Sequence, residues 1–315
     1  MVDKSFVVDW NKNSDTAYTA VLDESKLWHK RLGHSNYKSL VQLTKRDLIE
    51  NFSKSIEKED VCELCQLGKQ ARLPFPTNKA WRASERLQLI HTDVCGPMKT
   101  LSLNDSRYFI LSIDDYLRYY WIYFLKHKSE VASVFWKFKA AAETETSCKL
   151  KTLRSDNGTE YTSAMFQGFC DKVGIKHQLI NIYTLQQNGV SKRKNRSLMD
   201  MAKCLLFERN LPKTLWAEAV NTAVYLQNRL PTKALVHKTP FKAWFGFKPS
   251  IAHLRVFGCI CYAHVPTVKR DKLAKKAQPG ILVGYSSVKK GYRVLNPSSN
   301  KVFVSRDVVF NEKSG

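Results

Sequence analysis

Two aspartates and one lysine occupy positions at which three acids would form a two-metal phosphoryl-transfer site. Asp93 closes the apolar stretch 86–93, and Asp156 closes a second stretch, 150–156. Two acids at the ends of neighbouring strands, with a third on a following helix, can converge on two Mg²⁺ ions. Such ions activate a hydroxyl nucleophile and stabilise the leaving oxygen of an in-line displacement at phosphorus. Lys192 stands at the place for the third acid, separated from Asp156 by 35 residues.

The two aspartates also fit an ordinary structural role, because aspartate often initiates turns at strand ends. Asp156 precedes Asn157-Gly158, and Asp93 precedes a polar, turn-prone stretch. Two further acids are weaker alternatives for the third position. Glu160 follows Asp156 by four residues, beyond the expected strand end, and Asp115 lies next to Asp114 on an expected hairpin.

A second constellation has the residue types and spacing of a zinc site. His29, His34, Cys62 and Cys65 form the pattern His-x4-His-x27-Cys-x2-Cys. Zinc in structural sites takes four nitrogen or sulfur ligands in a tetrahedron, and Cys-x2-Cys supplies two at the right bite. Residues i and i+5 of a helix do not share a face, so the histidine pair requires a local bend. The alternative is a surface histidine pair with two unrelated thiols.

Composition favours a folded protein that binds a polyanion. The chain has 315 residues, 43% of them hydrophobic, and a formal net charge of +23. Phosphates neutralised by Lys or Arg release condensed counterions, which drives binding of basic proteins to nucleic acid. The alternative is a soluble basic protein without such a partner. No secretory signal and no apolar run of membrane-spanning length are visible, and eight cysteines then indicate free thiols in a reducing, intracellular compartment.

The order of expected elements indicates an α/β layer fold with a mixed sheet. Strands are expected to end at Asp93 and Asp156 and to cover 108–114, 119–125 and 175–180. Helices are expected over 26–50, over 129–146 with Ser129 as cap, and over 162–173, 186–210 and 212–229. An extended linker is expected from Leu67 to Trp81. Short strands at 256–263, 280–285, 291–295 and 301–305 predict a small C-terminal β-barrel.

Several motifs together resemble one known family. His91-Thr92-Asp93, the run 154–158 and the run 186–190 resemble the integrase of Ty1/copia-type LTR retrotransposons. Residues 27–34 and 62–69 resemble the zinc-binding segment that precedes that core. Residues 254–259 and 280–285 resemble the SH3-like module that follows it in these Pol polyproteins. The resemblance covers about residues 26–312.

This resemblance implies a ribonuclease-H-like core that joins reverse-transcribed DNA to host DNA by strand transfer. It implies an α/β fold, with a helical zinc-binding domain before the core and an SH3-like β-barrel after it. The corresponding boundaries are an irregular tail at 1–25, the zinc-binding domain at 26–80, the core with a helical extension at 81–248 and the β domain at 249–315. Implied cofactors are structural Zn²⁺ and catalytic Mg²⁺ or Mn²⁺. Implied partners are element-end and target DNA, with a possible homo-oligomer, no membrane and function in the nucleus.

In the family, two aspartates and a glutamate hold the catalytic metals. Asp93 and Asp156 match the first two, whereas Lys192 replaces the glutamate. Leu185 also stands where proline is usual, and Thr159 where glycine is common. A unit charge about 4 Å from another contributes about 4 kcal/mol at an effective dielectric constant of about 20, and twice that against a divalent ion. We therefore expect the substitution to lower strand transfer by orders of magnitude.

Two basic runs are candidate DNA contacts. Lys192, Arg193, Lys194 and Arg196 open an expected helix, with Gln187 and Asn188 near its start. Lys269, Arg270, Lys272, Lys275 and Lys276 flank the expected β strands. The alternatives are a solvated charged face for the first run and a mobile loop for the second. The aromatic residues Trp121, Tyr123, Phe135 and Trp136 are expected in the core rather than as base-stacking platforms.

Three functions remain open from the sequence. The first is an integrase that catalyses strand transfer, alone or as a fragment of its polyprotein. The second is a non-catalytic DNA-binding protein, either a decayed copy of the element or one adopted by a host. The third is a zinc-stabilised interaction module for RNA or an acidic partner. Lys192 favours the second, since nucleic-acid binding can persist without the third carboxylate.

Overall fold

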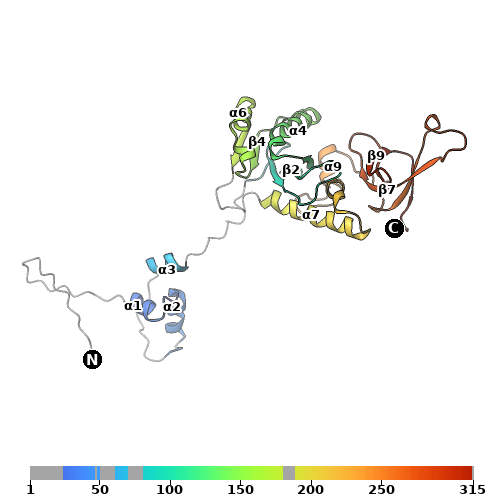
Figure 1. The fold of residues 1–315 in the computed structure, drawn as a ribbon. Helices are drawn as coiled ribbons and strands as arrows, with labels where there is room; N and C mark the ends of the chain where they lie inside the picture. The colour runs from blue at the N-terminus through green and yellow to red at the C-terminus, as the bar shows by residue number, and fades with distance from the viewer. Residues whose placement is uncertain (1–23, 47, 50–60, 70–80, 180–188, 314–315) are drawn as a thin grey trace, which may run out of the picture. The chain divides into compact units, whose positions relative to one another are not determined.

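The computed structural model describes residues 24–46, 48–49, 61–69, 81–179 and 189–313. The chain divides into two compact units, Met1–Pro76 and Thr77–Gly315, and Figure 1 shows the helices and strands of each. The expected tail up to residue 23, most of the expected linker, and the candidate DNA contacts Gln187 and Asn188 lie outside the described residues.

The first unit contains three short helices, α1 (Glu24–Arg31), α2 (Tyr37–Lys45) and α3 (Glu63–Lys69). The helical pattern expected over 26–50 is therefore two helices. The chain turns between them at Gly33 and His34, which have φ angles of +63° and +60°. Asn36 then caps α2, because its side chain accepts a hydrogen bond from the backbone N–H of Ser39 at 2.7 Å. The expectation of an extended linker from Leu67 was wrong at its start, because Leu67 lies within α3.

The second unit is built on a five-stranded mixed sheet. Its strands are β1 (Ile90–Cys95), β2 (Tyr108–Asp114), β3 (Tyr120–Leu125), β4 (Thr152–Ser155) and β5 (Lys176–Leu179). Their order is β3-β2-β1-β4-β5; β1 pairs antiparallel with β2 and parallel with β4. The predicted mixed sheet is confirmed. The carboxyl ends of β1 and β4 consequently lie at one end of the sheet.

Helices cover both faces of this sheet. Helices α4 (Val131–Thr146) and α6 (Ala164–Val173) belong to one layer, and α7 (Gly189–Glu208) and α8 (Trp216–Gln227) to the other; Figure 1 shows α4 and α7 on opposite sides of β2. Side chains of β2 alternate between the layers, with Ile110 in the first core and Phe109 in the second. The aromatic residues expected in the core pack in or against the first one, namely Trp121, Tyr123, Phe135 and Trp136.

Two helix boundaries differ from those expected. Ser129 does not cap α4, because it lies inside a 3-10 turn, Lys128–Glu130, that precedes the helix. The helix expected over 162–173 begins two residues later, as α6, and a separate short helix, α5 (Thr159–Thr162), precedes it. Ser163 separates them: its backbone is extended, and its hydroxyl accepts the N–H of Phe166 at 3.4 Å. The short α5 places residues just after Asp156 back against the sheet.

The C-terminal part is an antiparallel sheet of five strands, which follows helix α9 (Pro240–Phe245). The strands are β6 (Ile260–His264), β7 (Ala277–Tyr285), β8 (Tyr292–Asn296), β9 (Lys301–Ser305) and β10 (Val308–Asn311), in the order β10-β6-β7-β8-β9. The hydrophobic pattern predicted four of them and missed β10, a four-residue strand of mixed exposure. This architecture is SH3-like, as expected.

The C-terminal sheet packs directly on α8. The Arg293 guanidinium makes two hydrogen bonds to the Glu218 carboxylate, at 2.7 and 2.5 Å. The Thr222 hydroxyl donates to the Val283 carbonyl oxygen at 3.3 Å. At Gly284, which has a φ of +143°, a Cβ would lie 2.6 Å from the Thr222 Oγ1, so only glycine allows this close approach. Val283 also belongs to the core that α7 and α8 form on the first sheet. The two sheets therefore share one hydrophobic core.

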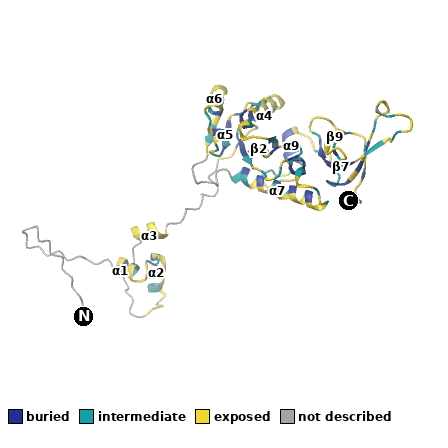
Figure 2. Cartoon of the chain, viewed as in Figure 1, coloured by how far each residue is buried: buried dark blue, intermediate teal, exposed yellow. Residues whose placement is uncertain are grey.

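Figure 2 shows how burial follows these layers: buried residues lie on the strands, and α7 has buried and exposed residues along its length. The buried residues of α7 are Ser191, Asn195, Leu198, Ala202 and Leu206. They recur at helical spacing and form the face that lies on the sheet. In the described part of the chain, no helix has the length and apolar character needed to cross a membrane.

Candidate functional sites

The parallel pairing of β1 and β4 brings the two aspartates together. Ile90 pairs with Leu153 and His91 with Arg154. Continuing this register by two residues sets Asp93 beside Asp156, just past the end of β4. Side chains at the same register of neighbouring strands point to the same face. The convergence expected from the sequence is therefore present in the fold.

Asp93 is buried, and its surroundings set its charge. It is 6% exposed, and the Asn195 side-chain N–H donates to its Oδ2 at 2.7 Å. Burial raises the pKa of Asp93 to about 7, and the negative charge of Asp156 adds to the increase. Lys192 and the Asn195 hydrogen bond act in the opposite direction. Asp93 thus interacts with both of the other residues of the expected triad.

Helix α7 places Lys192 at the third position of this site. Asn195, which contacts Asp93, lies one helical turn after Lys192, so the two residues share a side of the helix. Lys192 itself is half-buried. The structure therefore brings Asp93, Asp156 and Lys192 to one end of the sheet, with a cation where a third carboxylate was expected.

Glu160 is a further acid of this site. It lies on α5, and its side chain is only 5% exposed. Its Oε1 lies 3.5 Å from the Lys128 ammonium, and its charge contributes to the raised pKa of Asp93. Sequence spacing alone placed Glu160 beyond the strand end, which is correct. What the spacing missed is that α5 starts immediately after Gly158 and keeps Glu160 against the site.

Asp115 belongs to a different cluster at the opposite end of β1. Its carboxylate accepts hydrogen bonds from the His91 Nε2 at 3.0 Å and the Ala83 N–H at 2.9 Å, and it forms an ion pair with the Arg118 guanidinium at 2.9 Å. Burial alone would raise the pKa of Asp115, but these partners lower it to about 2. Asp115 is therefore a paired structural carboxylate and does not face the Asp93 site.

The basic residues at the start of α7 do not all face solvent. Arg193 and Arg196 are exposed. The Lys194 ammonium instead lies 4.8 Å from the centre of the Tyr120 ring and donates to the Gln227 Oε1 at 3.1 Å. Burial lowers the pKa of Lys194. Lys194 thus packs inward, whereas Arg193 and Arg196 are accessible to a large polyanion.

The second basic run lies in the connection between β6 and β7. The 3-10 turn Thr267–Lys269 opens it. The half-buried Arg270 donates from Nε to the Val265 carbonyl oxygen at 3.3 Å. The side chains of Lys272, Lys275 and Lys276 are exposed. Three of the five expected contacts are therefore on an accessible loop.

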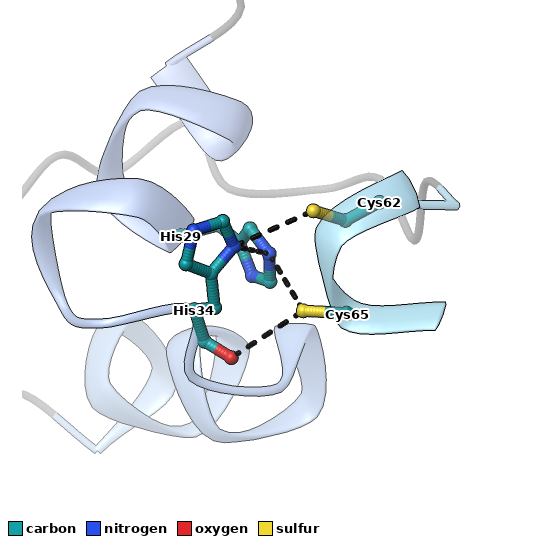
Figure 3. A group of neighbouring side chains, drawn as sticks. All are labelled: His29, His34, Cys62 and Cys65. Atoms are coloured by element: carbon teal, nitrogen blue, oxygen red, sulfur yellow. Dashed lines mark hydrogen bonds between the residues drawn. The ribbon is translucent and has the colours of Figure 1, made fainter. Parts of the chain in front are cut away.

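The four expected zinc ligands converge within the first unit. His29 Nε2 lies 3.1 Å from His34 Nδ1 and 3.3 Å from Cys65 Sγ, and His34 Nδ1 lies 3.4 Å from Cys62 Sγ (Figure 3). All four ligand atoms lie within 4.8 Å of one another. Tetrahedral zinc with nitrogen and sulfur ligands has ligand atoms about 3.3–3.8 Å apart. The group therefore fits zinc with small side-chain adjustments.

Local structure prepares these ligands for a metal. The bend required between the histidines is present at Gly33 and His34, where φ is positive. The His29 Nδ1 donates to the Ser35 carbonyl oxygen at 2.7 Å, which fixes the ring and leaves Nε2 free of a proton. A backbone hydrogen bond from Cys65, together with His29, lowers the pKa of the Cys62 thiol to about 6. A thiolate is the form that binds zinc.

Comparison with known domain families matches three parts of the chain. Residues 4–70 match the GAG-pre-integrase domain, residues 83–184 the integrase core domain and residues 259–315 the retroviral polymerase SH3-like domain. A chain in the cryo-EM structure of the simian T-cell lymphotropic virus intasome in complex with PP2A regulatory subunit B56 gamma has a TM-score of 0.51 and 17% identity. The alignment covers 90% of this chain and 96% of that one. At this identity the likeness establishes the fold alone.

These findings give the chain the domain order of a helical GAG-pre-integrase domain, an integrase core domain with a ribonuclease-H-like fold and an SH3-like domain. More narrowly, the chain belongs with the copia-type retrotransposon Pol polyproteins. It is 45% identical over 286 residues to the retrovirus-related Pol polyprotein from transposon TNT 1-94 of Nicotiana tabacum, and 35% identical over 286 residues to that from transposon RE2 of Arabidopsis thaliana. Each alignment covers 91% of this chain, which spans about a fifth of the length of those relatives (21% and 19%).

Proposed function

We propose that this chain is an integrase-derived protein that binds DNA and has lost strand transfer because Lys192 replaces the third carboxylate. The observation that carries the proposal is the position of Lys192 on α7, one turn before the residue that contacts Asp93. A positive charge at this point opposes cations that the aspartates would hold. The loss of activity would follow from one side chain in an otherwise intact fold.

The residues of the site fit divalent metal at two of the three family positions. Asp93 and Asp156 would hold Mg²⁺ or Mn²⁺, which in such sites activates a hydroxyl nucleophile and stabilises the leaving oxygen. Asn195 orients Asp93 through its hydrogen bond. Lys192 repels a divalent ion by about 2 kcal/mol in water at about 4 Å, and by several times that in a partly buried site. Metal binding is weakened accordingly.

Zinc in the first unit would be structural. Four nitrogen and sulfur atoms converge there, so a tetrahedral ion would have no open position for a substrate. Among the described residues of this unit, the core consists of Tyr37 and Leu40 with three partly buried neighbours, and so small a core favours a metal that adds folding free energy. We retain 26–80 as the zinc-binding domain, 81–248 as the core with its extension and 249–315 as the SH3-like domain.

DNA is the proposed partner, in the form of element ends and target DNA. The support is the net charge of +23 together with the exposed Arg193 and Arg196 beside the acidic site. The exposed lysines of the β6–β7 connection would form a second contact, and self-association a further one. The nucleus is the proposed place of function, because the family's target DNA is chromosomal, and a cytoplasmic particle is the alternative. Phosphate contacts of this kind are independent of the third carboxylate, so they can outlast the loss of catalysis.

The decisive activity experiment compares the unmodified chain with Lys192→Glu. In a strand-transfer assay with Mg²⁺ or Mn²⁺ and element-end DNA, we expect no product from the unmodified chain and some product from Lys192→Glu. Asp156→Asn added to Lys192→Glu should remove it again. Strand transfer by the unmodified chain that disappears in Asp156→Asn overturns the proposed loss of catalysis.

DNA binding is tested by titration over a series of salt concentrations. Removing one phosphate-binding side chain lowers the slope of log K against log salt by about one. We expect Arg193→Gln with Arg196→Gln to lower the slope, whereas the neighbouring Lys194→Gln leaves it unchanged because Lys194 packs inward. Salt-insensitive binding would instead favour the third function, an interaction module for another partner.

Zinc is tested by metal analysis of the purified chain. We expect one Zn²⁺ per chain, absent in Cys65→Ser and kept in Cys204→Ser, which changes an exposed cysteine outside the cluster. Full zinc content in Cys65→Ser contradicts the assignment.

A further inference from the structure

The acidic end of the sheet contains a buried oxygen atom without a partner. The Glu160 side chain is 5% exposed, and among the residues that the structure describes its Oε2 makes no hydrogen bond. Its Oε1 has only a long contact with Lys128, at 3.5 Å. An ionised carboxylate that is buried and incompletely paired costs free energy, so it requires either a structural reason or a ligand.

Glu160 is directed toward the residues that would hold a metal. A Cβ added at Gly158 would lie 2.8 and 2.9 Å from the two Glu160 carboxylate oxygens, so the carboxylate lies against the turn that follows Asp156. The charge of Glu160 acts on Asp93 and on Tyr161. The Tyr161 hydroxyl is already engaged with the Thr92 Oγ1 at 2.9 Å, on the strand that carries Asp93. Glu160 thus lies against the turn that follows Asp156, close enough for its charge to act on Asp93.

We propose that Glu160 is the third carboxylate of a divalent-cation site with Asp93 and Asp156, and that this chain binds Mn²⁺ or Mg²⁺ there despite Lys192. Three carboxylates outnumber the two nearby ammonium groups of Lys128 and Lys192, so the site keeps a net negative charge when all are ionised. Oxygen ligands of this kind suit hard divalent cations. The inference deepens the proposed function, because it gives the catalytically weakened site a ligand set of its own.

Lys128 would compete with the cation for the Glu160 carboxylate. Among the described residues, only the His29 group already gathers three or more ligand atoms, so the three carboxylates must close around an ion. Glu160 would exchange its Lys128 contact for the metal. Lys128 is about half exposed and can turn into solvent once Glu160 leaves it. Removing the Lys128 charge should therefore strengthen cation binding, which a purely structural Glu160–Lys128 pair does not predict.

The test is Mn²⁺ binding by the zinc-loaded full chain without DNA, followed by the electron paramagnetic resonance signal of free Mn²⁺. We expect Glu160→Gln to weaken binding by at least about tenfold and Lys128→Met to strengthen it, given the charge removed at about 4 Å. The matched control is Glu85→Gln, which changes another glutamate paired with a lysine, Lys151, near the opposite ends of β1 and β4. Circular dichroism of each variant checks its fold.

Unchanged Mn²⁺ affinity in Glu160→Gln overturns the inference, even if Asp156→Asn lowers that affinity. If Glu160→Gln does not fold, Lys128→Met decides: stronger binding supports Glu160 as a ligand, and unchanged binding rejects it. The proposed DNA-binding function fails separately, through a salt-insensitive DNA titration. Mn²⁺ binding that depends on Glu160 would stand in that case.

Discussion

Acidic clusters lie at both ends of strand β1, and they differ in how fully their carboxylates are paired with other groups of the protein. At the amino end, Asp115 accepts hydrogen bonds from His91 and the Ala83 N–H and forms an ion pair with Arg118. Neighbouring Asp114 accepts the N–H groups of Leu87 and Leu117, at 2.8 and 2.6 Å. These carboxylates are occupied by groups of the protein itself.

At the carboxyl end, Asp156 and Glu160 have fewer strong partners among the described residues, and two lysines lie near this cluster. Asp156 accepts one N–H, from Gly158 at 3.2 Å, and Glu160 keeps an oxygen without a hydrogen bond among the described residues. Burial and mutual repulsion raise the pKa of Asp93 to about 7, whereas hydrogen bonds lower that of Asp115 to about 2. This comparison indicates that burial alone does not identify a carboxylate that is able to bind a cation. Incomplete pairing does, because it leaves room for an external cation.

The largest expected effect is a difference in the free energy of unfolding between variants at the two ends of β1. Asp115→Asn leaves the Arg118 guanidinium without its counter-charge, and we expect a loss of about 3 kcal/mol in the free energy of unfolding. Asp156→Asn, at the other end, should change it by less than about 1 kcal/mol. Urea unfolding of both variants measures the difference. Equal losses would remove the distinction between a structural and a functional cluster.

The second prediction uses pH to sharpen the same contrast. The folded-state pKa of Asp115, about 2, lies below the ordinary aspartate value of 3.8. Its stabilising contribution is therefore complete above about pH 4 and disappears as the pH falls toward 2. The stability difference between the unmodified chain and Asp115→Asn should shrink by about 2 kcal/mol over that interval. A constant difference in urea unfolding across these pH values would contradict the pairing of Asp115.

A smaller effect is expected at Asn195, the protein's own partner for Asp93. Its hydrogen bond to Asp93 is buried, and such bonds contribute about 1 kcal/mol. A double-mutant cycle with Asn195→Ala and Asp93→Ala should give an interaction energy of about that size. An interaction energy near zero would mean that Asn195 does not hold Asp93 in place.

The smallest expected effect concerns DNA. Lys192→Gln should lower the salt dependence of DNA binding by about one phosphate contact and leave stability nearly unchanged. Arg118→Gln, which removes a cation from the amino-end cluster, should lower stability and leave the salt dependence of DNA binding nearly unchanged. DNA titrations and urea unfolding of the two variants provide the comparison. A salt slope that changes in Arg118→Gln but not in Lys192→Gln reverses the assignment.

Much of this site was predictable from the sequence because strand ends and helix starts fix it. The strands ending near Asp93 and Asp156 and the helix that carries Lys192 were all found by their apolar patterns. The zinc ligands were found by spacing, together with the need for a bend at 30–34. These features depend on local sequence, so local reasoning was sufficient.

What the sequence did not reveal depends on contacts between distant residues. The inward packing of Lys194 requires Tyr120 and Gln227, which belong to other elements. The pairing of the Asp115 carboxylate depends on a hydrogen bond from His91, which lies 24 residues earlier in the chain. The position of Glu160 at the site depends on a short helix that the sequence did not predict, α5, which precedes the expected helix and ends before Ser163. No pattern within a single element carries that information.

The docking of the C-terminal sheet on α8 has a consequence for how such polyproteins evolve. Arg293 and Glu218 lie 75 residues apart in sequence, yet they form a partly buried ion pair, and only glycine fits at position 284 because Thr222 faces it closely. Exchange of the SH3-like domain between elements by recombination would separate these pairs and leave a buried carboxylate on α8. Inheritance of the core and the C-terminal sheet as a single block avoids that mismatch.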